Sequence, residues 1–270
     1  ETAQAAHYVL PACSHLEKWG VAYTYNVCHC MPFLMLRKKC IEPLGESWSE
    51  WRFISALAKR LGLTGRFPWA SEKEFVAFMV NPSGLSFDVL LNEKPEGDFY
   101  AEKQYVIPEK LFRTPSGKIE IYSETLEKEG FDPLPAYLEP ERGPVRGEKD
   151  FLQKYPLILS VGNRNIYYTH SQQRQVPALK KIFPEPLTEI GPGTAQKFGI
   201  ESGDLIVVET NTGRVKMKAC VDESVAEGVV LVPHGWSGEA NANLLTDVTC
   251  REPIMGYPDQ KSLQCAIRRA

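Results

Sequence analysis

Short apolar runs of strand length follow one another from residue 155 toward the C-terminus, and this pattern constrains the fold more than any other feature. Residues 157–161, 205–208 and 229–233 are almost entirely apolar, as strands buried on both faces are. Residues 214–221 instead alternate apolar with basic side chains, as in a half-buried strand. A short helix, ended by Gly199, is expected over residues 194–198. Short strands, tight turns and few helices predict a small closed β-barrel.

The first 150 residues have a different sequence pattern, in which signals for the start of a helix recur. Ser47 and Glu50 form a capping box before an apolar stripe at helical spacing (Trp51, Ile54, Leu57, Ala58 and Leu61). Ser71 and Glu74 form a second capping box, and the Asn-Pro pair at 81–82 ends the helix it begins. Residues 112–122 predict a β-hairpin with its turn at 114–117.

A segment rich in proline, glycine and charge separates these two patterns. It covers residues 132–149 and has the composition of a linker. We therefore expect two domains: an α/β segment over residues 1–150 and a mostly β domain over residues 151–270. A chain of 270 residues is long enough for both.

Composition excludes several classes of function. With a net charge of −3, the chain has no excess of basic residues for binding nucleic acid. Its content of 43% hydrophobic residues excludes general disorder. No apolar run approaches the roughly 20 residues of a membrane span. The chain starts at Glu1 without a visible signal peptide, and we interpret it as a piece of something longer, so the compartment, periplasmic or cytoplasmic, stays open.

The cysteines do not predict a disulfide framework or a zinc site. There are seven, an odd number, and no CxxC motif occurs. Cys28, His29 and Cys30 form one cluster that could supply soft metal ligands, but a strand with cysteines on one face explains it equally well. We therefore name no metal ligand in this chain, and no residue is assigned a catalytic role.

Three polar segments follow the predicted strands and are candidates for ligand binding. Residues 162–174 are crowded with Asn, Arg, His, Ser and Gln, residues 233–243 hold His234, Trp236 and two asparagines, and residues 256–261 end in a lysine. Arg and Lys suit phosphates, and amide side chains suit the edge of a base or pterin. Each segment also has a plainer interpretation, as a solvated loop, and His234 could be either an acid or base or a structural residue.

Taken together and in order, these segments resemble the C-terminal part of the molybdopterin oxidoreductases, the dimethyl-sulfoxide-reductase superfamily. The resemblance begins in residues 1–20 (ETA, VLPA and EKWG) and continues through FRTPSGKIE at 112–120. It then follows G-x-R at 162–164 with HS and R at 170–174, the stretch from 187 to 204, HGW at 234–236, N-x-N at 241–243 and residues 253–261.

The resemblance implies a double-psi β-barrel that helps hold a bis(molybdopterin guanine dinucleotide) cofactor carrying molybdenum or tungsten. The candidate cofactor contacts that it implies are Gly162, Arg164, His170, Ser171, Arg174, Asn241, Asn243 and Lys261. It also implies a 4Fe-4S cluster and the metal-ligating residue in an N-terminal part that is not recognised here. The partners it implies are the rest of the same catalytic subunit, an iron–sulfur electron-transfer subunit and a small-molecule substrate, with no nucleic acid and no direct membrane span.

One departure from the family's pattern and two alternative functions qualify this interpretation. Gly191-Pro192-Gly193 replaces the family's usual Asn-or-His-Pro-acidic stretch, so contacts there are open. The versions of the motifs found here are most similar to a branch whose members reduce sulfur or arsenic oxyanions, dehydroxylate or transhydroxylate aromatics, or hydrate acetylene. A free-standing double-psi barrel that binds a nucleotide or a protein without redox chemistry is the main alternative, and a small Cys/His hydrolase is a weaker one.

Overall fold

The computed structural model describes residues 2–22, 32–101, 112, 114–134, 136–137 and 148–270, and the Cys28–Cys30 cluster lies outside this description. The chain divides into two compact units, Glu1–Ser123 and Glu124–Ala270. Residues 138–147, which precede the predicted domain boundary near 150, are not described, and we keep that boundary as a proposal. No helix in the described ranges is long and apolar enough to cross a membrane.

The first unit packs helices against a small antiparallel sheet. The sheet order is β1-β2-β3, with β1 at Gly20–Ala22, β2 at Phe33–Arg37 and β3 at Asp98–Phe99. The helices of this unit are α1 (Thr2–Ala5), α3 (Glu50–Arg60), α4 (Glu72–Val80) and α5 (Phe87–Asn92), with single 3₁₀ turns at Thr64–Arg66 and Asn81–Ser83. Its core joins β2 to α4 and α5 through Leu34, Leu36, Val76, Val80 and Leu90. The α/β character expected of this segment is confirmed.

The two predicted helices form, but one begins at a different cap. Ser71 caps α4 as expected, and its Oγ accepts the Glu74 backbone N–H at 3.2 Å. The first capping box was wrong: the N-cap of α3 is Ser49, whose Oγ accepts from the Arg52 N–H. Ser47 does not cap the helix, because its hydroxyl bonds to the Glu17 carboxylate and the Leu44 carbonyl.

The predicted hairpin at 112–122 is also wrong. The turn forms, with the Gly117 N–H donating to the Thr114 carbonyl at 3.0 Å, but residues 118–122 lie in no strand. Ile119 and Ile121 are 70% and 76% exposed. A two-stranded hairpin that buries neither face is marginal in water, so a good turn sequence is not sufficient here.

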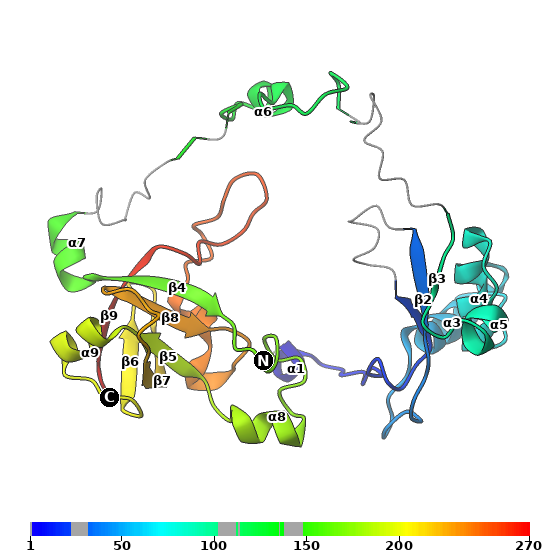
Figure 1. Ribbon diagram of the computed structural model, residues 1–270, viewed down its shortest axis with the longest axis horizontal. Helices are drawn as coiled ribbons and strands as arrows, with labels where there is room; N and C mark the ends of the chain where they lie inside the picture. Colours follow the sequence, from blue (N-terminus) through cyan, green and yellow to red (C-terminus); the bar gives the residue numbers. More distant parts are fainter. Residues whose placement is uncertain (1, 23–31, 102–111, 113, 135, 138–147) are drawn as a thin grey trace. The chain divides into compact units, whose positions relative to one another are not determined.

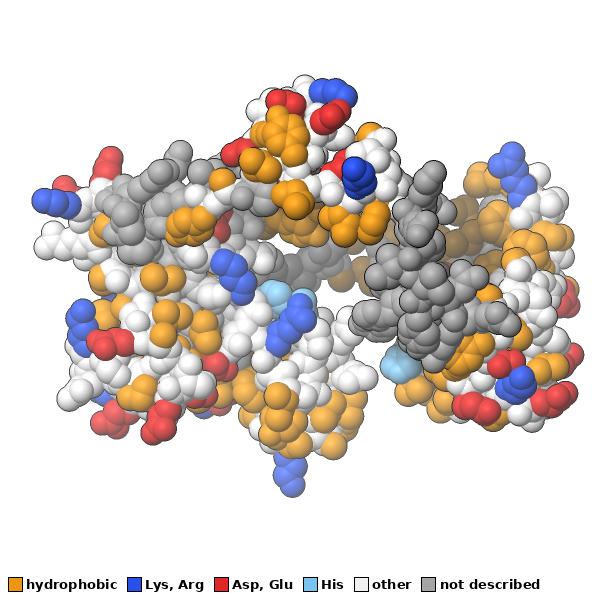
Figure 2. Space-filling model, turned by 45° about the horizontal axis from the view of Figure 1, so that its top comes forward, with side chains coloured by type: hydrophobic (Ala, Val, Ile, Leu, Met, Phe, Trp, Pro, Cys, Tyr) orange, Lys and Arg blue, Asp and Glu red, His pale blue; other side chains and the backbone are white. Residues whose placement is uncertain are grey.

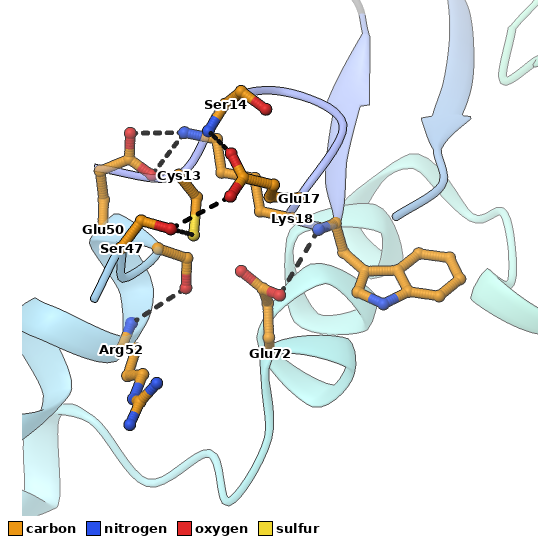
Figure 3. A network of polar contacts seen from close by, with 10 residues as sticks. Cys13, Ser14, Glu17, Lys18, Ser47, Glu50, Arg52 and Glu72 are labelled. Carbon is orange, nitrogen blue, oxygen red and sulfur yellow. Dashed lines mark hydrogen bonds and ion pairs between the residues drawn. The ribbon is translucent and has the colours of Figure 1, made fainter. Parts of the chain in front are cut away.

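A buried carboxylate ties the N-terminal segment of the first unit to the segment that leads into α3 (Figure 3). Glu17 is 6% exposed, and its carboxylate accepts the N–H groups of Ser14 (2.7 Å) and Leu44 (2.5 Å) and the Ser47 hydroxyl (3.1 Å). These hydrogen bonds lower the pKa of Glu17 to about 2, and the bond from the Leu44 N–H has the largest effect. The adjacent Lys18 pairs with Glu50 at the start of α3. The charged form of Glu17 therefore holds these two segments together.

Glu17→Gln is expected to destabilise the full chain at neutral pH and to change how its stability depends on pH. A carboxyl whose pKa is lowered on folding stabilises the folded state above its ordinary value of 4.5 and loses that contribution as the pH falls toward about 2. The stability difference between the two proteins should thus shrink between these pH values. Urea unfolding across this range measures it, with Glu46→Gln, an exposed neighbour, as control. If the stabilities of the native protein and Glu17→Gln changed with pH in parallel, Glu17 would contribute nothing to the pH dependence of stability.

The second unit is built on a closed barrel (Figure 1). All of its strands lie within the fully described stretch 148–270, and they close in the order β4-β8-β5-β7-β6-β9. The strands are β4 (Leu157–Asn163), β5 (Leu187–Ile190), β6 (Leu205–Glu209), β7 (Arg214–Val221), β8 (Val229–Pro233) and β9 (Leu263–Arg269). β4 runs parallel to β8 and β5 parallel to β7, and the remaining neighbours are antiparallel. The predicted mostly β barrel is confirmed.

Side chains from all six strands fill the barrel interior. The buried members include Leu159, Ile190, Ile206, Met217 and Val230, and none of these exposes more than 2% of its surface. The basic residues of β7 point outward, as the alternating sequence predicted. The unit also holds α6 (Glu124–Lys128), α7 (Lys149–Lys154), α8 (Pro177–Ile182), α9 (Pro192–Phe198, the predicted short helix, ended by Gly199) and 3₁₀ turns at Gly238–Ala240 and Ala242–Leu245.

Candidate functional site

The strand directions bring the three polar segments to one end of the barrel. β4 and β8 are parallel neighbours in register Asn163 to Pro233, so the loops after both strands leave from the same end (Figure 1). β9 runs antiparallel to β4 with Leu263 opposite Leu159, so the segment before β9 reaches this end too. Residues 162–174, 234–243 and 256–261 therefore meet, although the sequence separates them by up to a hundred residues. We call this the polar end of the barrel.

Two histidines form the closest contact between these loops. His170 lies in the loop after β4 and His234 directly follows β8. Their Nε2 atoms are 3.0 Å apart, and their ring centroids are 3.9 Å apart. Both side chains are half-buried. Burial lowers the pKa of His234, and His170, Arg164 and Lys261 lower it further.

Glycines on both loops allow this close packing. A Cβ on Gly162 would lie 3.1 Å from the His234 ring. A Cβ on Gly235 would lie 2.8 Å from the backbone of His170, and Gly235 has a φ of +87° that favours glycine. Gly162, predicted as a cofactor contact, thus also serves the packing of one loop against the other.

Arg174 joins the same two loops by a second contact. Its guanidinium donates to the Gly235 carbonyl and lies over the Trp236 ring, 4.1 Å from the centroid. Guanidinium groups combine stacking with directed hydrogen bonds in this way. Trp236 lies in one of the three candidate segments but was not among the candidate cofactor contacts, and no signal in its neighbourhood pairs it with an arginine 62 positions earlier.

Lys261 is bound to β4, and this contact was not predicted either. Its Nζ donates to the Ser160 hydroxyl at 3.0 Å and to the Val161 carbonyl at 2.8 Å. The Val161 N–H in turn donates to the Gln260 carbonyl at 2.8 Å, which fixes the segment beside the strand. The ammonium group therefore stays at the polar end while its charge acts on His234.

The remaining predicted residues differ in how available they are. Asn241 uses its Oδ1 to accept the Asn243 N–H at 3.1 Å, which caps the 3₁₀ turn at Ala242–Leu245. Arg164, Ser171 and Asn243 are exposed. The polar end thus contains side chains that hold the loops together and side chains that are accessible to a ligand.

The chemistry of this donor set fits a nucleotide-type cofactor. Arg164, Arg174 and Lys261 bring positive charge from two different loops, which suits phosphate groups. Imidazole, hydroxyl and amide groups lie beside them and suit the hydrogen-bonding edge of a pterin or guanine ring. Within the described ranges, no group of three or more His, Cys, Asp or Glu side chains is placed to hold a metal ion directly.

Comparison with known proteins decides the family. Residues 157–263 match the family described as "Molydopterin dinucleotide binding domain". Acetylene hydratase of Syntrophotalea acetylenica is 37% identical over 242 residues, which cover 88% of this chain and 32% of that protein. The chain belongs to the molybdopterin oxidoreductases of the dimethyl-sulfoxide-reductase superfamily.

Two further comparisons agree, and both of those proteins are longer than this chain. The molybdopterin-containing subunit of thiosulfate reductase from Salmonella typhimurium is 29% identical over 95% of this chain and 37% of its own length. The solved structure of acetylene hydratase from Pelobacter acetylenicus superposes with a TM-score of 0.85 and 31% identity, over 100% of this chain and 39% of that one. The chain spans about a third of the length of these relatives.

The barrel is therefore a double-psi β-barrel, and residues 157–263 are a molybdopterin dinucleotide-binding portion of a member of this family. The family resemblance and the fold expected from the sequence are confirmed, and the matched family supports the expected molybdopterin dinucleotide cofactor.

Proposed function

We propose that the polar end of the barrel binds phosphate groups and ring edges of the cofactor. The observation that supports this most is the convergence of Arg164, Arg174 and Lys261 around His234 and Gly235, within the residues that match the family. Exposed Arg164, Ser171 and Asn243 are proposed as direct contacts. Gly162, His170, Arg174, Asn241 and Lys261 are proposed as contacts that also hold the loops in place.

The bound metal would supply oxidation–reduction or group-transfer chemistry toward a small-molecule substrate. This chain's own residues would bind and orient the cofactor, and we assign none of them a catalytic role. We further propose a 4Fe-4S cluster in the part of the enzyme that the longer relatives contain, and an iron–sulfur subunit as electron-transfer partner. Related proteins are a hydratase and reductases by name, so we propose no particular substrate for this chain.

We propose that the rest of the same catalytic subunit covers an apolar groove on the first unit. The groove has a volume of about 530 Å³ and is lined by Val9, Leu10, Trp48, Phe53 and Leu57, all of them exposed. Hydrophobic side chains are also visible on the surface in Figure 2. Of the apolar face predicted for α3, Leu57 lines this groove, whereas Ile54 and Leu61 do not line it but are exposed as well. Contiguous apolar surface of this kind marks an interaction site, and the relatives are about three times longer.

Metal analysis of the complete enzyme, made in a host that assembles this cofactor, tests the proposed function. We expect molybdenum or tungsten at about one atom per subunit, and guanine nucleotide released by acid treatment. Folded enzyme without metal or pterin would contradict the proposal. It would instead favour a free-standing barrel that binds a nucleotide or a protein partner, and nucleotide binding by the chain would then be measured directly.

A further inference from the structure

His170 and His234 at the polar end form a hydrogen bond that would break if both rings were protonated. At 3.0 Å, one Nε2 of His170 and His234 must carry the hydrogen and the other must accept it. If both rings were imidazolium, two N–H groups would point at each other and two like charges would lie in contact. The bond therefore exists while at most one of the two rings is charged.

The backbone depends on this bond. His170 has a φ of +56°, in the left-handed region that residues other than glycine seldom adopt. Surrounding contacts stabilise such a conformation. Here the contacts are the His234 ring on one side and the Gly235 backbone on the other. The loop of residues 162–174 thus keeps its conformation through the residue that follows β8.

The charges around the pair oppose a second proton. Arg164 comes from the same loop as His170, and Lys261 comes from the segment before β9. Arg174, which bridges to the Gly235 carbonyl, adds a third cation to these loops. Burial, His170, Arg164 and Lys261 all lower the pKa of His234 below its ordinary value of 6.5. An opened loop would release His234 from these effects and let it take up a proton more readily.

We propose that His234 is a positioning residue whose bond to His170 locks the loop of residues 162–174 in its cofactor-binding conformation, and that acid opens this lock. The proposal rests on the proposed function for its ligand, the molybdopterin dinucleotide. Because the pKa of His234 is lowered in the closed form, closure is favoured above about pH 6.5 and loses that advantage as the pH falls below it. The lock then opens without any change in the cofactor itself.

Hydrogen exchange of residues 162–174 in the 270-residue chain tests the lock without cofactor. For the native chain we expect slow exchange at about pH 7.5 and, after correction for the intrinsic pH effect, faster exchange at about pH 5.5. His234→Phe keeps a ring but removes the bond, so the loop should exchange about tenfold faster at both pH values. His234→Gln can donate from a similar position but does not titrate, so it should restore slow exchange and remove the pH dependence.

A matched control and a second readout separate the possible failures. His15→Gln removes an exposed histidine of the first unit and should leave loop exchange and its pH profile unchanged. Exchange in His234→Phe equal to that of the native chain would overturn the lock, whatever cofactor binds. In the complete enzyme, the native form should lose molybdenum at about pH 5.5 faster than His234→Gln does. Equal loss would overturn the role of the lock in cofactor retention. A lock confirmed in the chain while the enzyme carries no metal would contradict the proposed function instead.

Discussion

Arg164→Ala in the complete enzyme is expected to reduce molybdenum content sharply while turnover per bound metal is kept. Arg164 is exposed at the polar end, and its charge reaches His234, so it lies where the proposed cofactor phosphates would bind. A charge-assisted hydrogen bond contributes about 1.5–3 kcal/mol, which corresponds to roughly 10-fold to 150-fold weaker binding when it is lost. Metal content and activity, measured on the same preparation, give the two quantities separately.

Two control variants test whether the effect of Arg164→Ala depends on the shape of the charged group and on its position in the barrel. Arg164→Lys keeps the charge but loses the planar fork that binds phosphate at two points, and it should fall between the native enzyme and the alanine variant. Lys197→Ala removes an exposed cation from α9, which follows β5 at the opposite end of the barrel, and should leave metal content unchanged. Full metal content with collapsed turnover in Arg164→Ala would place this residue in a substrate site or an electron path.

We choose Arg164 for this test because the other predicted cations have structural contacts. Lys261→Ala would also remove two hydrogen bonds to β4, and Arg174→Ala would also remove the contact between two loops. A loss of metal in those variants would combine weaker binding with a displaced loop. The sequence alone did not separate these roles, since all three residues are simply basic residues in polar segments.

Much of the barrel could be predicted because its strands carry their own local signals. Residues 205–208 and 229–233 are apolar throughout, and β7 alternates, so the strands and their inward faces follow from the pattern. β5 and β9 were not predicted as strands. β5 has only four residues with a threonine and a glutamate between the apolar ones, and β9 ends in two arginines. Both segments form strands because the sheet closes into a barrel, and this closure depends on residues far apart in the chain.

The polar end could be predicted by composition but not by geometry. Its segments were recognised from their residue types, yet the contact between His170 and His234 depends on the parallel pairing of β4 with β8. The same limit explains the errors in the first unit. Ser47 and Ser49 are both acceptable caps by local rules, and Ser47 is taken by the distant Glu17 carboxylate. Local sequence selects candidates, and contacts far apart in the chain decide among them.

Ile206→Ala is expected to destabilise the barrel more than any surface substitution near it. Ile206 lies in the middle of the barrel core with 0% of its surface exposed, and its neighbours across the strands are Met217 and Arg269. Truncating a fully buried isoleucine costs about 2–5 kcal/mol, since the barrel cannot close around the cavity. Urea unfolding of the full chain, followed by hydrogen exchange in peptides covering residues 205–221, measures the loss.

Two variants on the same strand show whether burial is the cause. Ile206→Val removes one methylene and should cost about 0.5–1.5 kcal/mol. Leu205→Ala removes more carbon atoms than Ile206→Val does, but the Leu205 side chain is exposed on the opposite face of β6. It should therefore change the free energy of unfolding by no more than about 0.5 kcal/mol. Equal losses for Leu205→Ala and Ile206→Ala would contradict the inward and outward faces of β6. The loops of the polar end would then lack the rigid support from which their contacts are argued.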